Sequence, residues 1–179
     1  MIKPVERQLP AAYTAAMQTI LNLASRGLAF IAALALGISA GASLAEQTLL
    51  VPFWQSLSPI EFLEWYQNNK ARLVAFYSPL QIWSAVLALV ACVVSFVAGA
   101  PGKQKMLLLA ATLFAILVLA TFFAFFKDAN AALAAGVMEP AELREALEVW
   151  GGWQWGRIVL GTIAFGCAVA GQVGANKEE

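Results

Sequence analysis

The fold of this chain is decided by its longest stretch without a charged residue, Leu73–Gly102, which reads LVAFYSPLQIWSAVLALVACVVSFVAGAPG. Three further uncharged windows occur along the chain, at Gly27–Ala45, Met106–Phe126 and Ile158–Asn176. A helix needs roughly 20 mostly apolar residues to cross the hydrocarbon core of a bilayer, which is about 30 Å thick. Each window is close to that length or longer, so the sequence predicts four membrane-spanning helices.

The overall composition agrees with this prediction. The 179 residues are 61% hydrophobic and 12% charged, whereas soluble domains are roughly 45–50% apolar and 25% charged. The formal net charge is zero, so no basic field indicates binding to nucleic acid. We therefore expect the lipid bilayer as the main partner and no nucleic-acid partner.

Residues that bind metals or haem are scarce. The sequence contains no histidine, which removes the commonest metal ligand and general base. The two cysteines, Cys92 and Cys167, lie inside predicted spans without a metal-binding spacing, and we interpret them as packing residues. We therefore expect no metal and no cofactor.

The uncharged windows also define the domain organisation. We predict an interfacial N-terminal segment over residues 1–26, one four-span transmembrane domain over 27–176, and a tail over 177–179. The spans are expected at about 27–50, 79–100, 106–126 and 156–175. The fold class is therefore all-α: an integral membrane four-helix bundle with up-down-up-down topology and short interfacial helices in the two longer connections.

Prolines mark where these helices are expected to begin and end. Pro52 should end the first span, and Ser78-Pro79 should open the regular part of the second. The capping box Ser58-Pro59-Ile60-Glu61 should start a short interfacial helix over about 59–67, and a second is expected over about 140–150. Three aromatic residues of the first short helix are expected to face the bilayer surface: Phe62, Trp65 and Tyr66.

The orientation follows from the connections. Four spans place both termini and the short turn Pro101–Lys105 on one side of the membrane. That turn carries Lys103 and Lys105, and short loops rich in Lys and Arg favour the cytoplasmic side. We therefore expect both termini in the cytoplasm.

Polar and charged side chains, which cost free energy inside a membrane, gather at one end of the predicted bundle. They are Glu46, Arg72, Lys127, Asn130, Gln154 and Arg157. One hypothesis is a polar pocket in which Arg157 stabilises an anion and Glu46 accepts a proton. The other is an interhelical Glu46–Arg157 ion pair, with Asn130 or Gln154 hydrogen-bonded beside it. The sequence leaves both open, and the two can coexist.

Five tryptophans lie near the same end: Trp54, Trp65, Trp150, Trp153 and Trp155. Tryptophan at that depth is typical of the aromatic belt at a membrane interface. The alternative is a wall on which a planar ligand stacks. If the pocket exists, we expect four residues to bind the ligand: Trp54, Lys127, Asn130 and Trp150.

Two blocks of residues resemble those of a known family. The first runs from Gly37-Ile-Ser-Ala-Gly41 through Glu46 to Leu50-Val-Pro-Phe-Trp54 and Leu57-Ser-Pro-Ile-Glu-Phe-Leu-Glu-Trp65. The second is Asn130 followed by Trp150-Gly-Gly-Trp-Gln-Trp-Gly-Arg157. In order and spacing they resemble the anthrone oxygenase-like family of small four-helix integral membrane proteins, most of them bacterial. The resemblance covers about residues 27–169 and implies a location in a bacterial inner membrane.

The resemblance also implies a chemistry. Characterised fungal members of the family are described as oxidising anthrones to anthraquinones with molecular oxygen and no evident cofactor. Such a site must bind a planar substrate, accept a proton and stabilise an oxyanion. The resemblance implies Glu46 as the base, Arg157 and Gln154 as the groups that hold the oxyanion, and Trp150 as the stacking residue. Family members often have a histidine where this chain has Gln154, and a glutamine can orient a substrate but cannot transfer protons.

Two functions therefore stand side by side. The first is a cofactor-independent membrane oxidoreductase or oxygenase that binds a lipophilic aromatic or quinone-like molecule. The second is a non-enzymatic membrane protein, a packing partner or accessory subunit that binds another protein in the membrane. A cavity of several hundred cubic ångströms lined by Glu46, Asn130, Trp150 and Arg157 would favour the enzyme.

Overall fold

The computed structural model describes residues 11–175, and all regular structure in this range is helical. The elements are α1 (Ala11–Ala45), the π-helical turn η1 (Glu46–Leu50), α2 (Val51–Ser56), α3 (Pro59–Val97), α4 (Gly102–Thr121), the π-helical turn η2 (Phe122–Phe126), α5 (Lys127–Ala135) and α6 (Pro140–Ala175). Four stretches are long and apolar enough to cross a membrane: Tyr13–Ser56, Pro59–Val97, Gly102–Ala135 and Pro140–Val173. The chain is therefore an integral membrane protein with the all-α four-helix fold that the sequence predicts. The predicted tail and the first ten residues of the predicted N-terminal segment lie outside the described residues.

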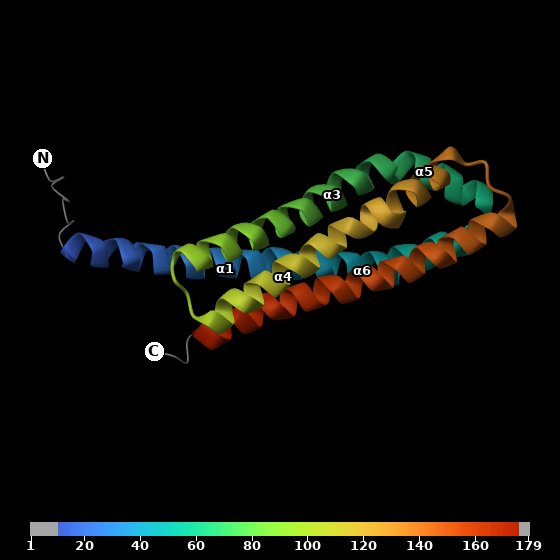
Figure 1. Cartoon of the computed structure of the whole chain (residues 1–179). Helices are drawn as coiled ribbons and strands as arrows, with labels where there is room; N and C mark the ends of the chain where they lie inside the picture. Colours follow the sequence, from blue (N-terminus) through green and yellow to red (C-terminus); the bar gives the residue numbers. More distant parts are fainter. Residues whose placement is uncertain (1–10, 176–179) are drawn as a thin grey trace, which may run out of the picture.

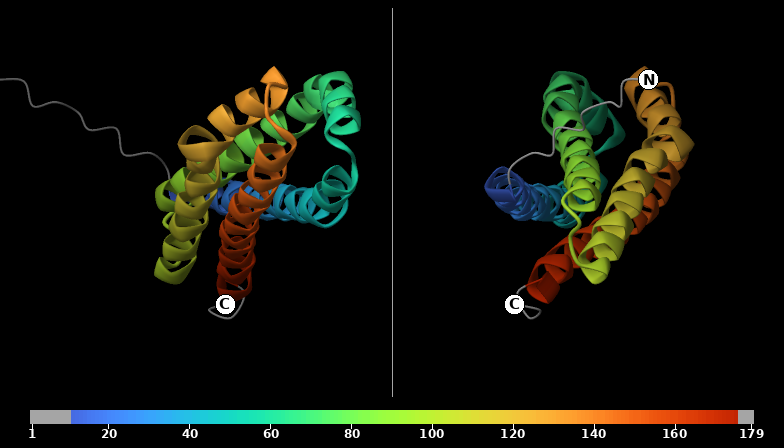
Figure 2. Two further views of the ribbon diagram at one scale, coloured as in Figure 1. Left: turned by 90° about the vertical axis from the view of Figure 1, so that its right-hand side faces the viewer. Right: turned by 60° about the vertical axis from the view of Figure 1, so that its left-hand side comes forward.

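The four long helices form an up-down-up-down bundle (Figure 1). Each packs against the next along the chain, and α6 closes the bundle by packing against α1. The beginning of α1, the end of α6 and the α3–α4 turn share one end of the bundle, where the first turns of α1 project beyond the other helices. Figure 2 shows that α1 and α6 cross at an angle. The other end holds η1, α2, η2 and α5, the four short elements.

Small residues fill the middle of the bundle. The buried cluster on its axis is mostly alanine, including Ala88, Ala111 and Ala164, and small side chains let membrane helices approach closely. At Gly37 the approach is especially close, since a Cβ there would lie 3.0 Å from Cε2 of Phe165. The middle of the bundle is therefore tightly packed, and a large cavity lies toward the end that holds the short elements.

The first span does not end at Pro52 as predicted. The backbone widens at Glu46, where the N–H of Val51 bonds to the carbonyl of Glu46 in the i to i−5 pattern of a π-helix. The chain then continues as α2, in whose first turn Pro52 lies. Because η1 is helical and directly precedes α2, Pro52 costs one backbone hydrogen bond, which in a membrane is less costly than breaking the helix.

The helix expected to be short over 59–67 is instead the beginning of α3. Its start is confirmed: the hydroxyl of Ser58 accepts the N–H of Glu61, whose side chain accepts the N–H of Ser58. The helix then continues through Pro79 to Val97. Inside a membrane the backbone must satisfy its own hydrogen bonds, so losing one N–H at a proline is less costly than breaking the helix. The helix over 140–150 and the fourth span form one element, α6, which begins at Pro140 and runs through Gly151 and Gly152 without a break. The short helices at this end are α2 and α5.

Two aromatic residues expected to face the bilayer surface lie in the interior instead. Phe62 and Tyr66 are 1% and 6% exposed. The turn at Ser58 folds α2 back along α3, so Trp54 packs against both rings, at centroid distances of 6.2 Å each. The start of α3 therefore contributes to the core, although its sequence has the aromatic character of an interfacial helix.

Candidate functional site

A cavity of about 600 Å³ lies at the end of the bundle that holds the short elements. Its size is in the range of pockets that bind small organic molecules. Its lining includes charged, amide and aromatic side chains from η1, α2, α3, α5 and α6: Glu46, Trp54, Tyr66, Lys70, Tyr77, Gln81, Asn130, Trp150 and Arg157. A cavity lined by four particular residues was expected to favour the enzyme, and all four line this one: Glu46, Asn130, Trp150 and Arg157.

Both π-helical turns border this cavity. Glu46 is the first residue of η1, and η2 contributes Phe122 to the lining. A π-helical turn inserts one residue into a helix and so re-aims the side chains around it, and such turns occur frequently at functional sites. The apolar windows of the sequence give no sign of either turn.

Glu46 is held by one hydrogen bond inside the protein. Its side chain is 5% exposed, and its Oε2 accepts a hydrogen bond of 2.7 Å from Nε2 of Gln154. Nε2 of Gln154 also donates to the carbonyl of Ser43 at 3.2 Å. Gln154 is completely buried and does not line the cavity. It therefore lies behind Glu46 and orients the carboxylate, whose Oε1 has no hydrogen-bond partner among the described residues.

Arg157 is buried against an aromatic ring. Its guanidinium carbon lies 3.6 Å from the centroid of Phe126, which is a close cation–π contact. Its Nε donates to Oγ1 of Thr121 at 3.4 Å. Within residues 11–175, Arg157 makes no ion pair with Glu46 or another carboxylate. The direct ion pair is thus not formed, and the two terminal nitrogens of Arg157 remain available to a ligand.

Two of the five tryptophans form a wall of the cavity. Trp150 is 4% exposed and donates its indole N–H to Oδ1 of Asn130 at 2.9 Å. Trp54 packs edge to face against Trp150, at a centroid distance of 5.3 Å. Trp153 and Trp155, in contrast, are 41% and 50% exposed. Trp54 and Trp150 are therefore buried in the cavity wall, whereas Trp153 and Trp155 lie on the surface of the bundle.

Two buried donors in the lining residues have no partner. They are Nε1 of Trp54 and Nε2 of Gln81, and neither makes a hydrogen bond among the described residues. A buried N–H without a partner costs about 1–3 kcal/mol. A ligand that carries acceptor oxygens could remove part of this cost.

Lys127, expected to bind the ligand, is exposed and does not line the cavity. The lining instead includes four polar residues of α3 that sequence reasoning did not select: Tyr66, Lys70, Tyr77 and Gln81. Their spacing of i, i+4, i+11 and i+15 places them on one helical face. This signal was in the sequence, but it becomes visible only if α3 runs without a break through Pro79.

No group of three His, Cys, Asp or Glu residues lies together as a metal site within the described range. No curated protein and no solved structure matches the chain. The sequence model of one family, anthrone oxygenase, matches residues 62–167. This interval is more than half of the chain and includes Lys70, Asn130, Trp150 and Arg157.

Proposed function

The chain belongs to the anthrone oxygenase family, and on that premise we propose that it oxidises a planar, lipophilic aromatic ketone with molecular oxygen. The observation that carries the proposal is a pair of opposite charges that line one cavity without touching each other. Glu46 accepts a hydrogen bond from Gln154, and the guanidinium of Arg157 lies over the ring of Phe126. A buried carboxylate and a buried guanidinium held apart in this way can accept a proton and stabilise an anion on the same ligand.

The aromatic wall supports a flat substrate. Trp54 and Trp150 present large rigid surfaces, and aromatic rings gain about 0.5–1.5 kcal/mol from stacked or edge-to-face contacts beyond their buried area. Arg157 would meet the ketone oxygen and Glu46 the acidic C–H. The N–H groups of Trp54 and Gln81 would serve further oxygens of the ligand.

The reaction balances without a further reductant. Glu46 removes a proton from the CH2 group, and the electron pair moves onto the ketone oxygen beside Arg157. The resulting enolate gives one electron to O2, and the carbon radical and superoxide combine into a C–O bond. The peroxide takes the proton back from Glu46. Glu46 then removes the second C–H proton, and the electron pair of that bond forms C=O as the O–O bond breaks and hydroxide leaves. Protonated Glu46 gives its proton to the hydroxide, so that CH2 and O2 become C=O and H2O and the carboxylate is restored.

Gln154 has a supporting part in this proposal. It does not line the cavity, so it would not hold the oxyanion, which the resemblance implied. Its N–H donates to the carboxylate at 2.7 Å, and a hydrogen bond to a charged acceptor fixes orientation strongly. Gln154 is then a positioning residue for the base.

The proposal is tested by turnover in detergent. Purified protein is mixed with 9-anthrone, and anthraquinone formation and O2 consumption are followed together, with heat-unfolded protein and empty micelles as blanks. A positioned base contributes about 10²–10⁴-fold to such rates, so Glu46→Gln should lose at least about 100-fold of the catalysed rate. One O2 should disappear per anthraquinone. A wild-type rate no higher than that of the blanks would overturn the proposal.

We also propose that both termini face the cytoplasm of a bacterial inner membrane. The α3–α4 turn, on the same side as the termini, carries Lys103 and Lys105, and Nζ of Lys105 lies 5.6 Å from the ring centroid of Phe96. Basic short turns favour the cytoplasmic side. A C-terminal fusion should be fluorescent with green fluorescent protein and inactive with alkaline phosphatase, and the opposite pattern would reverse the assignment.

A further inference from the structure

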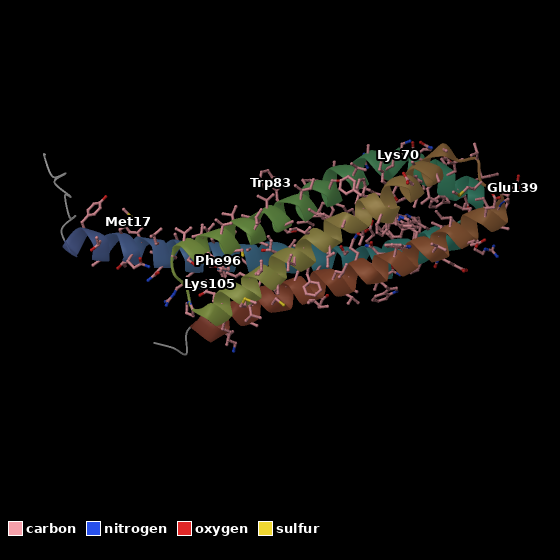
Figure 3. All side chains as sticks on the ribbon, in the orientation of Figure 1. Met17, Lys70, Trp83, Phe96, Lys105 and Glu139 are labelled. Carbon is pink, nitrogen blue, oxygen red and sulfur yellow. The ribbon has the colours of Figure 1, made fainter. Side chains whose placement is uncertain are left out.

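Lys70 gives the cavity a second cation at a place distinct from Arg157. It lies on α3 near the end of the bundle that also holds Glu139 (Figure 3). Its side chain is half-buried and lines the cavity together with the exposed residues Ala71 and Val74. Arg157, in contrast, is 6% exposed. Lys70 therefore marks the open rim of the cavity and Arg157 its interior.

The ammonium group of Lys70 has no acidic partner within the described chain. Its Nζ donates to the side-chain oxygen of Gln67, and Nε2 of Gln67 donates to the carbonyl of Ala134 on α5. These contacts hold Lys70 at the rim between α3 and α5 through neutral groups only. The charge itself is left uncompensated.

The charges that line the cavity do not balance. Two cations, Lys70 and Arg157, face one carboxylate, Glu46, so the lining carries one net positive charge. The proposed proton transfer neutralises Glu46 and creates one negative charge on the substrate, so the excess of one positive charge persists through the reaction. The excess positive charge attracts anionic ligands more strongly than neutral ones of the same size. One further negative charge on the ligand would balance the charges of the cavity both before and after the proton transfer to Glu46.

We propose that Lys70 is a specificity-determining residue that selects ligands with an anionic substituent, a carboxylate or acidic phenol, at the edge opposite the reacting carbon. This inference rests on the proposed function, because it takes the ligand to be a planar aromatic ketone. The aromatic body lies against the wall formed by Trp54 and Trp150, and the anionic group remains at the rim beside Lys70. Such a ligand is an amphiphile whose polar edge stays near the membrane surface.

The experiment compares two probes of the same size that differ in charge, anthraquinone-2-carboxylate and anthraquinone-2-carboxamide. Binding is read from quenching of tryptophan fluorescence in an uncharged detergent, which requires no turnover. The quantity of interest is the carboxylate-to-carboxamide affinity ratio of each variant divided by that of the wild type. Partitioning of the probes into micelles cancels in this quotient.

Three variants distinguish a direct contact between Lys70 and the ligand from a general effect of positive charge near the cavity. Lys70→Met should lower the affinity ratio about five- to tenfold, the size of one partly solvated charge interaction. Arg72→Met removes a positive charge two residues away on an exposed side chain that does not line the cavity, and it should leave the ratio unchanged. Lys70→Arg should retain most of the preference because it keeps the charge.

The outcomes distinguish the two proposals. If Lys70→Met leaves the ratio unchanged, or if Arg72→Met lowers it as much as Lys70→Met, the role of Lys70 is refuted while aromatic binding stands. If neither probe binds, both proposals fail. Dodecanoate serves as a competitor with the same carboxylate on a flexible chain, and it should compete at least about tenfold more weakly than the aromatic carboxylate. Equal competition would overturn the proposal in favour of a lipid carboxylate at the rim.

Discussion

Glu46 and Arg157 should stabilise each other across the cavity although they do not touch. Two opposite charges that share a site just beyond contact interact by about 2–4 kcal/mol at an effective dielectric constant near 20. Glu46→Gln keeps the shape of the side chain and a neutral hydrogen bond with Gln154. Arg157→Met loses a cation–π contact of about 2 kcal/mol but no longer buries a charge, which costs roughly 2.5–3.5 kcal/mol in a membrane. Glu46→Gln likewise no longer buries a charge, so the attraction is measured by the interaction energy between the two substitutions and not by either single variant.

The assay is a double-mutant cycle on thermal unfolding in detergent. The thiol of Cys92 is 5% exposed, so its reaction with a fluorogenic dye reports unfolding once the half-buried Cys167 is replaced by serine in every protein. The interaction energy of the cycle should be about 2 kcal/mol, which corresponds to roughly 4–8 °C for a chain of this length. The double variant should be no less stable than the worse single variant, because the second substitution removes a charge that has already lost its partner.

The refuting result is simple additivity. If the losses of the two single variants add in the double variant within about 0.5 kcal/mol, the two residues act independently. Other groups would then compensate the two charges, and there would be no electrostatic reason to assign Glu46 and Arg157 to the same ligand.

Two further substitutions test the packing that positions the site. Gly37→Ala should destabilise the bundle relative to Gly41→Ala in the same thermal assay, because a Cβ at Gly37 would lie 3.0 Å from a ring carbon of Phe165 whereas nothing lies within 4 Å at Gly41. Equal behaviour of the two variants would mean that the helices adjust freely. Trp150→Phe removes the 2.9 Å hydrogen bond to Asn130 and should lower stability by about 1 kcal/mol. In an Asn130→Ala background the same substitution should cost much less, and an undiminished loss there would show that the bond is not the source of the effect.

The sequence determined the membrane class, the number of spans and the end of the bundle where chemistry could occur. These properties depend on composition and on the spacing of charges along the chain. Glu46, Asn130, Trp150 and Arg157 could be grouped because a four-span topology brings the ends of particular spans to the same side. This grouping depends on the topology alone and not on side-chain contacts.

The role of each side chain was decided by the tertiary structure. Gln154 was expected to face the ligand, but it contacts Glu46 from behind. Lys127 and Lys70 are both lysines at the same end of the bundle, and only Lys70 lines the cavity. Which side of a helix faces the interior depends on its neighbours, and in an apolar helix the hydrophobic pattern does not distinguish a lipid-facing side from a core-facing one.

Helix continuity had the largest consequence for the site. Pro52 and Pro79 predicted breaks that the structure does not contain, because a membrane makes an interrupted backbone more costly than one missing hydrogen bond. Because α3 is continuous from Pro59 to Val97, one face of this helix lines the cavity with Tyr66, Lys70 and Gln81. The uncharged windows by themselves thus determined that the chain crosses the membrane four times. The burial of Glu46 and Arg157 at one cavity, unpaired with each other, depends on long-range packing that local sequence does not encode.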